Sequence, residues 1–370
     1  MSVVWVILGW ILAIFFGLVT ISMLLLHNWA QAIVAFLLVL FCFPPVTSFL
    51  QNRFDFSIHP LLRGVLIVGL LAIFAWLLVG RQATSIYASP EVKARFMAIY
   101  DKKMGEWPVP YEDLFLDTEY GTVHVIASGP QDAPPLLLLH ASGVSGWSWK
   151  YNAAGLSENY RTYAIDLIGD AGKSEYTSLD HIMKNGQDQA RLYAEISDKL
   201  GIEKAYVAGA SEGGFIGSNY ALYAPERVEK LVLLGPMGYA GATQSIVRIT
   251  LAQLFPLRSV QDSTFRWAFS DSDVLGADLG EWFHLLMSES TPKKVAPLPL
   301  PAEDRQRLAV PVLFILGEKD NLVGDPRKAR DLVQDIPDVQ VEIVNAGHLM
   351  GGEIPEQINT LITDFFADPT

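Results

Sequence analysis

A Gly-x-Ser-x-Gly pentapeptide, Gly209 to Gly213, constrains the fold of this chain more than any other stretch of the sequence. It follows an apolar run, 205–208, and precedes a stretch of helical character, 215–224. A serine nucleophile must stand on a tight strand-to-helix turn, where glycines on either side remove side chains that would clash. The amino end of the following helix favours developing negative charge. The pentapeptide makes Ser211 a candidate nucleophile, with an ordinary tight turn as the alternative interpretation.

Strands and helices alternate along the chain around this motif. A continuous apolar run, such as 135–140, is typical of a strand that is buried on both faces. The expected strands are 113–117, 122–127, 135–140, 160–166, 205–208, 228–234, 310–316 and 339–344, and the expected helices are 181–200, 215–224, 325–336 and 354–366. The first two strands form a hairpin around Tyr120-Gly121. The alternation predicts an α/β domain over 111–370, with a mostly parallel sheet covered on both faces.

One long segment, 239–309, interrupts this alternation. It is rich in aromatic residues and ends in a proline-rich stretch, 297–301. An insertion of this length is rarely a plain loop, so we expect a mostly helical cap over the strand ends. Such a cap would line an apolar pocket beside the candidate nucleophile. The candidate pocket residues are Trp267, Trp282 and Phe283.

The chain is 51% hydrophobic, and the excess lies at its beginning, where residues 1–80 carry only three charged residues. Crossing the hydrocarbon core of a bilayer takes roughly 17–25 apolar residues. A cleaved signal peptide is disfavoured because no basic segment precedes the first run, and two further runs disfavour a buried helical core. Pro44-Pro45 should kink or end the second helix. We predict three transmembrane helices, at 3–26, 29–50 and 64–80.

The charges beside these predicted helices bear on their orientation. An odd number of spans places Met1 and residue 81 on opposite sides of the membrane. The loop 51–63, on the Met1 side, carries two basic residues. The segment that begins at Arg81, on the other side, carries three basic residues close to the membrane. The positive-inside rule then favours a cytoplasmic C-terminal domain in an integral, multi-pass membrane protein.

Residues 81–110 are expected to form an amphipathic linker. Within it, 90–105 has the pattern of a short helix with one apolar face. That face consists of Val92, Phe96, Ile99, Tyr100 and Met104. The helix would pack either on the membrane surface or on the domain, and packing on the domain is the commoner arrangement.

Charge and cysteine content exclude several classes of function. Residues 81–370 contain 25 Lys and Arg against 39 Asp and Glu, so that their net charge is −14. Nucleic-acid binding needs Lys and Arg for the phosphates, so we expect no nucleic-acid partner. The single cysteine, Cys42, rules out an intrachain disulfide and a cysteine metal cluster. We expect neither a metal nor an organic cofactor.

Four further stretches, in a fixed order, accompany the pentapeptide. Two precede it: an apolar run that ends in His140-Ala141-Ser142-Gly143, and the stretch 166–174 with its glycines. Two follow it: Leu316 to Asp320 and Asn345 to His348. With these motifs the segment 111–370 resembles the α/β-hydrolase family. In this chain Ala141 stands where the family usually has glycine.

The resemblance implies a catalytic triad. Ser211 would attack a carbonyl carbon, His348 would serve as general base and then general acid, and Asp320 would orient the imidazole. The order Ser, Asp, His along the chain is the one that this family uses. Asp166 and Asp170 compete for the role of the acid, but they precede the serine in the sequence.

The resemblance also implies an oxyanion hole formed by the backbone N–H groups of Ser142 and Glu212. His140 is expected to support the loop rather than to act in catalysis. The side chain of Glu212 would either bind a basic group of the substrate or cap the following helix, and capping is the simpler interpretation.

The sequence as a whole predicts a membrane-anchored serine hydrolase that cleaves a carboxylic ester, with lipid-derived esters among the candidates. Its partners would be a small acyl substrate and the lipid bilayer. The same triad also serves peptide, thioester and carbon–carbon substrates, which remain open. A non-catalytic binding or signalling module that keeps the fold is the alternative from another class, and Ala141 is its support.

Overall fold

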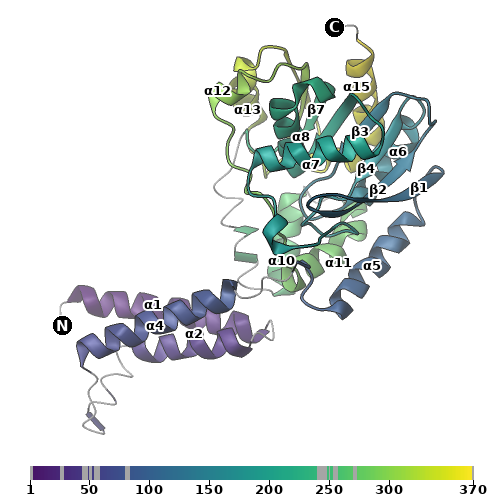
Figure 1. Ribbon diagram of the computed structural model, residues 1–370. Coiled ribbons are helices and arrows are strands. Elements are labelled where there is room, and N and C mark those ends of the chain that lie inside the picture. Colours follow the sequence, from purple (N-terminus) through teal and green to yellow (C-terminus); the bar gives the residue numbers. More distant parts are fainter. Residues whose placement is uncertain are drawn as a thin grey trace. The chain divides into compact units, whose positions relative to one another are not determined.

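The computed structural model describes residues 3–25, 29–43, 49, 52–53, 59–79, 84–239, 248–249, 251–252, 257–269 and 273–368 (Figure 1). The chain divides into two compact units. The first comprises Met1–Ala83 and Leu251–Leu257, and the second comprises Thr84–Thr250 and Arg258–Thr370. We call them the helical unit and the hydrolase unit, and describe each by itself.

The helical unit contains helices α1 (Val3–Leu25), α2 (Trp29–Cys42) and α4 (Pro60–Val79). α2 packs against both α1 and α4. The core of this unit is small and consists of Phe16, Val34 and Leu38, with partly buried apolar neighbours around them. Each of the three predicted membrane-spanning runs therefore forms a helix.

These helices differ from the predicted spans in length. α2 ends at Cys42 rather than at 50, and Pro44-Pro45 lie outside the described residues. Its 14 residues extend about 21 Å at about 1.5 Å per residue, short of the roughly 30 Å of a bilayer core. Across the described residues, no helix has the combined length and apolar character that a membrane span requires. The predicted three-span anchor is thus unsupported by the structure.

The hydrolase unit is built on one nine-stranded sheet. The strands are β1 (Tyr111–Asp117), β2 (Gly121–Ser128), β3 (Pro135–Leu139), β4 (Arg161–Ile165), β5 (Glu175–Tyr176), β6 (Ala205–Ala210), β7 (Val228–Leu234), β8 (Val312–Gly317) and β9 (Val339–Val344). Their order is β1-β2-β4-β3-β6-β7-β8-β9, with β5 beside β2. The strands from β4 to β9 in this order run parallel, whereas β1 and β2 are antiparallel. The predicted hairpin and mostly parallel sheet are confirmed.

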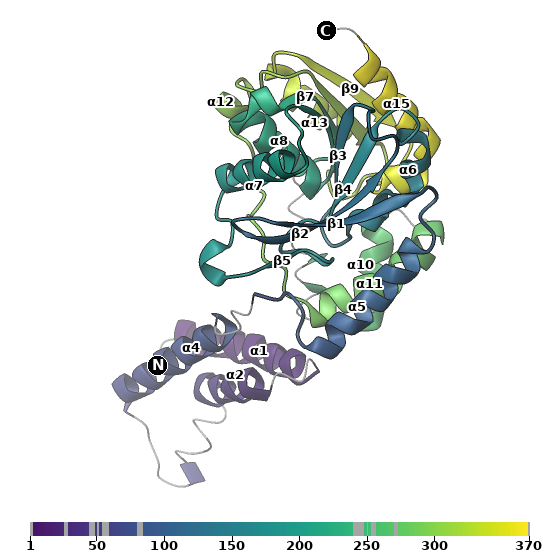
Figure 2. The same ribbon diagram turned by 45° about the vertical axis from the view of Figure 1, so that its right-hand side comes forward.

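Helices cover the sheet on both sides (Figures 1 and 2). α7 (Gly186–Lys199) and α8 (Glu212–Tyr223) pack together on one side, and α6 (Lys150–Leu156) and α15 (Pro355–Ala367) pack together on the other. The shorter elements are α12 (Ala302–Arg305), α13 (Pro326–Leu332), α14 (Met350–Glu353) and the 3₁₀ turns η1 (Gly146–Trp149), η2 (Leu179–His181), η3 (Pro225–Arg227) and η4 (Val333–Asp335).

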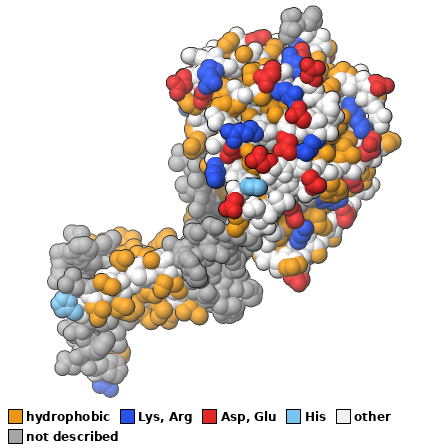
Figure 3. Space-filling model, viewed as in Figure 1, with side chains coloured by type: hydrophobic (Ala, Val, Ile, Leu, Met, Phe, Trp, Pro, Cys, Tyr) orange, Lys and Arg blue, Asp and Glu red, His pale blue; other side chains and the backbone are white. Residues whose placement is uncertain are grey.

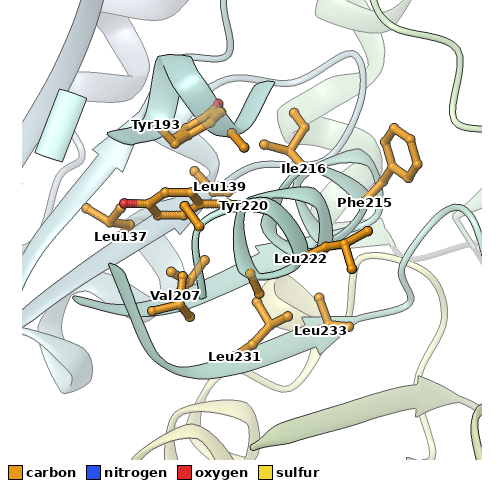
Figure 4. Close-up of a cluster of buried hydrophobic side chains, with 14 of the residues drawn as sticks. Leu137, Leu139, Tyr193, Val207, Phe215, Ile216, Tyr220, Leu222, Leu231 and Leu233 are labelled. Carbon is orange, nitrogen blue, oxygen red and sulfur yellow. The ribbon is translucent and has the colours of Figure 1, made fainter. Parts of the chain in front are cut away.

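The core follows the two-residue period of the strands. Leu137 and Leu139 of β3 belong to the cluster beneath α7 and α8, whereas Leu136 and Leu138 belong to the opposite cluster. Figure 4 shows the first cluster, in which side chains from β3, β6 and β7 meet Tyr193 of α7 and Tyr220 of α8. Burial on both faces explains why these strands read as continuous apolar runs.

The predicted helix over 181–200 begins later, at Gly186. Asn185 is the residue that starts it, because its side chain accepts a hydrogen bond from the backbone N–H of Asp188. The η1–α6 segment, 146–156, was not predicted. Its short length and mixed polarity give no helical periodicity.

Helix α5 (Pro90–Met104) occupies the predicted amphipathic segment. Val92, Phe96, Tyr100 and Met104 are buried in the hydrolase unit. Of the two arrangements expected for this helix, packing on the domain is the one observed. Ser89 caps its amino end by accepting a hydrogen bond from the N–H of Val92.

The described part of the insertion 239–309 contains α10 (Arg258–Ala268), α11 (Asp273–Glu289) and α12. An irregular segment, 291–301, joins α11 to α12, and we call it the return segment. Backbone hydrogen bonds join the return segment to the rest of the hydrolase unit. Thr291 N–H donates to Ile86 O at 2.7 Å, and Lys293 N–H donates to Gly169 O at 2.7 Å.

Candidate active site

Ser211 occupies a strained turn between β6 and α8. Its φ of 51° and ψ of −110° make it the one non-glycine residue with positive φ among the described residues. Such a conformation costs on the order of 1–3 kcal/mol and is common at functional sites. A Cβ atom at Gly209 would lie 2.3 Å from Gly213 O, and one at Gly213 would lie 2.2 Å from Leu139 O. The predicted steric need for both glycines is therefore confirmed.

The Ser211 turn is held against the end of β7. Ser211 N–H donates to Leu234 O at 2.9 Å, and Met237 N–H donates to Ser211 O at 3.0 Å. The serine is only 2% exposed, at the amino end of α8. This places its hydroxyl beside the carboxyl ends of the parallel strands, where ligands of open α/β sheets bind.

Asp320 and His348 follow the carboxyl ends of β8 and β9. His348 Nδ1 lies 2.8 Å from Asp320 Oδ2. The other carboxylate oxygen, Oδ1, accepts hydrogen bonds from the N–H groups of Leu322 and Val323 at 2.9 and 3.0 Å. Since Nδ1 donates to the carboxylate, Nε2 of the neutral imidazole is left to accept a proton.

The pKa of His348 reflects two opposing effects. Burial is the largest effect and lowers the pKa of the imidazole, because it disfavours the charged form. The charge and hydrogen bond of Asp320, with a smaller effect of Glu353, outweigh burial, so that the pKa of His348 is raised. The pair is thus arranged to stabilise an imidazolium.

Gly235, directly after β7, lies between the residue that binds the Ser211 turn and the Asp320–His348 pair. It follows Leu234, which binds the Ser211 turn, and its own N–H donates to Ile315 O at 2.9 Å. A Cβ atom at Gly235 would lie 3.0 Å from Asp320 Oδ2 and 3.4 Å from His348 Nδ1. A side chain at this position would therefore crowd the Asp320–His348 pair.

The loop that carries Ser142 lies against the nucleophile turn. Gly213 N–H donates to His140 O at 3.1 Å, Gly143 N–H donates to Asp170 Oδ2 at 2.7 Å, and Trp282 Nε1–H donates to Gly143 O at 2.8 Å. Within the part of the chain that the structure describes, the N–H groups of Ser142 and Glu212 have no hydrogen-bond acceptor. Both donors are available for a ligand.

His140 is fully buried and has a partner for each ring nitrogen. Nδ1 lies 2.8 Å from Ala141 O, and Nε2 accepts a hydrogen bond from Leu167 N–H at 2.9 Å. Burial lowers the pKa of His140, which keeps its imidazole neutral. These two backbone contacts agree with the expected loop-supporting role.

Asp166 and Asp170, the alternative acids, serve other partners. Asp166 Oδ2 lies 3.0 Å from His124 Nδ1, and its Oδ1 accepts the N–H of Gly146 at 2.7 Å. Asp170 binds Gly143 N–H, as above. Neither carboxylate contacts His348 among the described interactions, which favours Asp320 as its partner.

An open cavity adjoins these residues, and its empty space of about 530 Å³ includes the solvent at its mouth. Ala210, Leu234 and His348 line its wall on the side of the candidate triad. Its remaining lining is largely apolar and includes Trp147, Trp149, Leu279, Leu349 and Met350. The two tryptophans were missed in the sequence, although they stand a few residues after the His140 loop.

The predicted pocket residues Trp267, Trp282 and Phe283 are absent from the lining of this cavity. Trp282 is 1% exposed, and its indole N–H donates a hydrogen bond to Gly143 O. Trp282 therefore supports the loop that carries Ser142. Trp267 lies against Arg248, and Phe283 packs against Phe265. Among the cap residues whose side chains are described, Leu279 lines the cavity.

Lys294 was also missed, and it changes the interpretation of Glu212. Its Nζ lies 2.7 Å from Glu212 Oε2. The carboxylate therefore has a partner from the protein itself, which neither of the two expectations for Glu212 included.

Among the described residues, no cluster of three or more His, Cys, Asp or Glu is arranged to hold a metal.

Comparison with known proteins places this site in a wider group. Carboxylesterase YbfK of Bacillus subtilis is 34% identical over 287 residues, covering 75% of this chain and 96% of that protein. The uncharacterized carboxylesterase nap of the same organism is 32% identical, covering 74% of this chain and 92% of that protein. The crystal structure of naproxen esterase from Bacillus subtilis superimposes with a TM-score of 0.70 at 30% identity, covering 75% of this chain and 99% of that one.

A model of the alpha/beta hydrolase family matches residues 136–360, which is more than half of the chain. The similar proteins are named carboxylesterases, and the solved structures are esterases and hydrolases. The chain belongs to the alpha/beta hydrolase family and is a serine hydrolase of the carboxylesterase type.

Proposed function

We propose that this protein hydrolyses carboxylic esters through a triad of Ser211, His348 and Asp320. The observation that carries the proposal is the buried Asp320–His348 hydrogen bond of 2.8 Å, at the same edge of the sheet as the strained Ser211 turn. A buried imidazole that is oriented by a carboxylate is what activation of a serine requires.

The reaction would proceed in two halves. Ser211 Oγ attacks the ester carbonyl carbon while His348 Nε2 takes the hydroxyl proton, and Asp320 stabilises the imidazolium through Nδ1–H. His348 then protonates the leaving alkoxide as the carbon–oxygen bond breaks, which leaves an acyl-enzyme. A water molecule, deprotonated by His348, attacks this acyl group and releases the carboxylic acid and Ser211.

The backbone N–H groups of Ser142 and Glu212 would receive the negative oxygen of the tetrahedral intermediate. Their lack of acceptors among the described residues supports this role. A single donor of this kind typically contributes about 3–4 kcal/mol to transition-state stabilisation. The position of Glu212 at the first turn of α8 adds the favourable end of the helix dipole.

The cavity indicates the chemistry of the substrate. Its largely apolar and aromatic lining, including Trp147 and Trp149, favours an ester with an apolar acyl or alcohol group. Polar substrates would lose hydration there without compensating hydrogen bonds.

The experiment that tests the proposal is labelling of the full-length protein by a fluorophosphonate probe, followed by assays with esters, thioesters and amides. Wild type should be labelled and should hydrolyse short apolar esters, whereas folded Ser211→Ala should do neither. Folded wild type that resists the probe would favour the non-catalytic binding module, with Ala141 as the departure to examine. Faster turnover of thioesters or amides than of esters would change the substrate class.

We also propose that the helical unit attaches this enzyme to a lipid bilayer. Large apolar side chains are exposed on its helices, including Ile11 and Ile14 at 57% and Val65 at 67%. Figure 3 shows hydrophobic side chains spread over the described surface of these helices. Extensive exposed apolar surface is typical of proteins that contact a membrane or a partner.

Attachment can be measured by sedimentation of the full-length protein with phosphatidylcholine–phosphatidylglycerol vesicles. Wild type should sediment with the vesicles, and Ile14→Lys should shift to the supernatant because a charge is costly within the bilayer. Leu332→Lys, at an exposed apolar position of the hydrolase unit, is the matched control. Wild type that stays in the supernatant would contradict attachment. If wild type sediments with the vesicles, protease accessibility in closed vesicles tests the cytoplasmic orientation.

A further inference from the structure

Lys294 joins three separate segments at the candidate active site. Its Nζ lies 2.6 Å from Ser142 Oγ, 2.6 Å from Asp170 Oδ2 and 2.7 Å from Glu212 Oε2. The lysine side chain is 18% exposed, and the two carboxylates are 1% and 5% exposed. One partly buried ammonium group therefore binds the loop after β3, the loop after β4 and the first residue of α8.

The backbone holds this lysine in place. Lys293 N–H donates to Gly169 O at 2.7 Å, and a Cβ atom at Gly169, whose φ is 85°, would lie 2.1 Å from Lys293 O. The return segment of the cap thus approaches the 166–174 loop as closely as a glycine allows. The position of the ammonium group is built into the fold.

The electrostatic environment keeps Lys294 charged. Burial is the largest effect and lowers the pKa of the ammonium group, but the charges of Asp170 and Glu212 outweigh it and raise the pKa. Without the ammonium group, two buried carboxylates would face each other without a counter-ion. Their repulsion would separate the segments that carry them.

Two of the three segments carry the candidate oxyanion donors. Ser142 and Glu212 each present an N–H group without an acceptor among the described residues. The third residue, Asp170, binds Gly143 N–H at 2.7 Å, directly after Ser142. A shift of about 1 Å in a reacting geometry can lower a rate about 100-fold. The distance between the two N–H groups is therefore a quantity that the fold must control.

We propose that Lys294 is a positioning residue that sets the spacing of the two oxyanion donors by holding the side chains of Ser142 and Glu212 on one ammonium group. This inference rests on the proposed ester hydrolysis. It assigns the Glu212 carboxylate to the protein's own cation, so that a basic group of the substrate has no free acceptor there. Because Lys294 comes from the return segment, the cap takes part in building the oxyanion hole.

The test compares full-length Lys294→Met, Lys294→Arg and Lys293→Met with wild type. Lys293 has no side-chain partner in the described interactions and is the matched control. The assays measure kcat and KM for a short apolar ester, and inhibition by a trifluoromethyl ketone and by the corresponding methyl ketone. The trifluoromethyl ketone adds to the serine and forms an oxyanion, whereas the methyl ketone reports ground-state binding.

For Lys294→Met we expect kcat to fall about 10- to 100-fold with little change in KM. Inhibition by the trifluoromethyl ketone should weaken by a similar factor, while the methyl ketone should bind with unchanged affinity. Lys294→Arg should recover much of the loss, and Lys293→Met should match wild type. If Lys294→Met fails to fold, Ser142→Ala removes a single contact of the ammonium group and should still lower kcat about 10-fold.

Two results with folded Lys294→Met would overturn this inference without affecting the proposed function. In the first, folded Lys294→Met has the kcat of an active wild type. In the second, both ketones weaken equally, which indicates a general loss of the pocket. If the variant does not fold, an unchanged kcat in Ser142→Ala overturns it instead. Wild type without turnover of any ester would overturn the proposed function and, with it, this inference.

Discussion

The imidazole of His348 and the carboxylate of Asp320 are joined by a 2.8 Å hydrogen bond, although they lie on loops that follow different strands. β8 and β9 are neighbours in the sheet and run parallel, so their carboxyl ends meet at one edge. The sheet topology thus brings together two residues that are 28 positions apart in the sequence. The pair also sets requirements on its neighbours, and these lead to testable predictions.

Gly235→Ala should impair catalysis more than stability. The new Cβ atom would lie 3.0 Å from Asp320 Oδ2, and the φ of 50° is unfavourable for alanine. Gly324→Ala is the matched control, because Gly324 has a φ of 88° but no atoms near its Cβ position. Both variants should lose about 1–2 kcal/mol of unfolding free energy from the backbone, measured by chemical denaturation. Only Gly235→Ala should lose more than about 10-fold in kcat, and equal kcat losses would contradict the steric argument.

Glu353 should influence the pH dependence of turnover. Its Oε2 accepts the N–H of Gly347 at 2.7 Å, and its charge helps to raise the pKa of His348. The enzyme needs a neutral imidazole, so activity falls as the pH drops below the pKa of His348. Glu353→Gln removes the charge and should move this acid limb of kcat/KM to lower pH. Glu356→Gln, on the exposed start of α15, should leave the limb in place. A shift to higher pH in Glu353→Gln would contradict the electrostatic assignment.

The strands of the sheet could be predicted from the sequence because the core strands are buried on both faces and form continuous apolar runs. Runs such as 135–140 and 228–234 differ from strands by at most a residue or two at their ends. The glycines around Ser211 were predicted for a steric reason that the structure bears out. These signals are local, so a reader of the sequence alone can find them.

Other features depend on tertiary contacts that have no local signature. Lys294 lies in an irregular segment, and its partners are 82 to 152 residues away in the sequence. Trp282 was predicted to line the pocket, but burial against Phe96 and a hydrogen bond to Gly143 O give it another role. Aromatic content indicated a cap, and it did not indicate which faces of the cap helices reach the cavity.

The contact between α5 and the sheet should make stability depend on pH. Tyr100 of α5 lies 3.2 Å from His124 Nδ1, and the two ring nitrogens of His124 contact Asp166 and Asp113 at 3.0 and 2.8 Å. Burial is the largest effect and lowers the pKa of His124, but hydrogen bonds and charges of both carboxylates outweigh it and raise the pKa. A raised folded pKa means that protonated His124 stabilises the fold fully below its unfolded value of about 6.5.

That stabilisation is lost as the pH rises through the folded pKa of His124. The difference in Tm between wild type and His124→Gln should therefore be largest near pH 5 and should shrink toward about pH 8. The measurement is thermal denaturation followed by circular dichroism across this range. His181→Gln, at an exposed histidine, should track wild type at every pH. A difference that grows with pH would reverse the sign of the argument.

The cavity beside His348 should limit the size of the substrate. Leu279 of α11 is 5% exposed and lines this cavity. Leu279→Trp adds a large ring, and overfilling a packed site costs about 1–3 kcal/mol, which corresponds to roughly 5- to 150-fold in an affinity. Turnover of a naphthyl or long-chain ester should fall by such a factor in kcat/KM, whereas an acetate ester should be nearly unaffected. Leu298→Trp, at a position that is 70% exposed, is the control for a surface tryptophan. If both esters lose turnover equally in folded Leu279→Trp, the cavity is not the site of the large substrate group, and its apolar lining serves the packing of the cap instead.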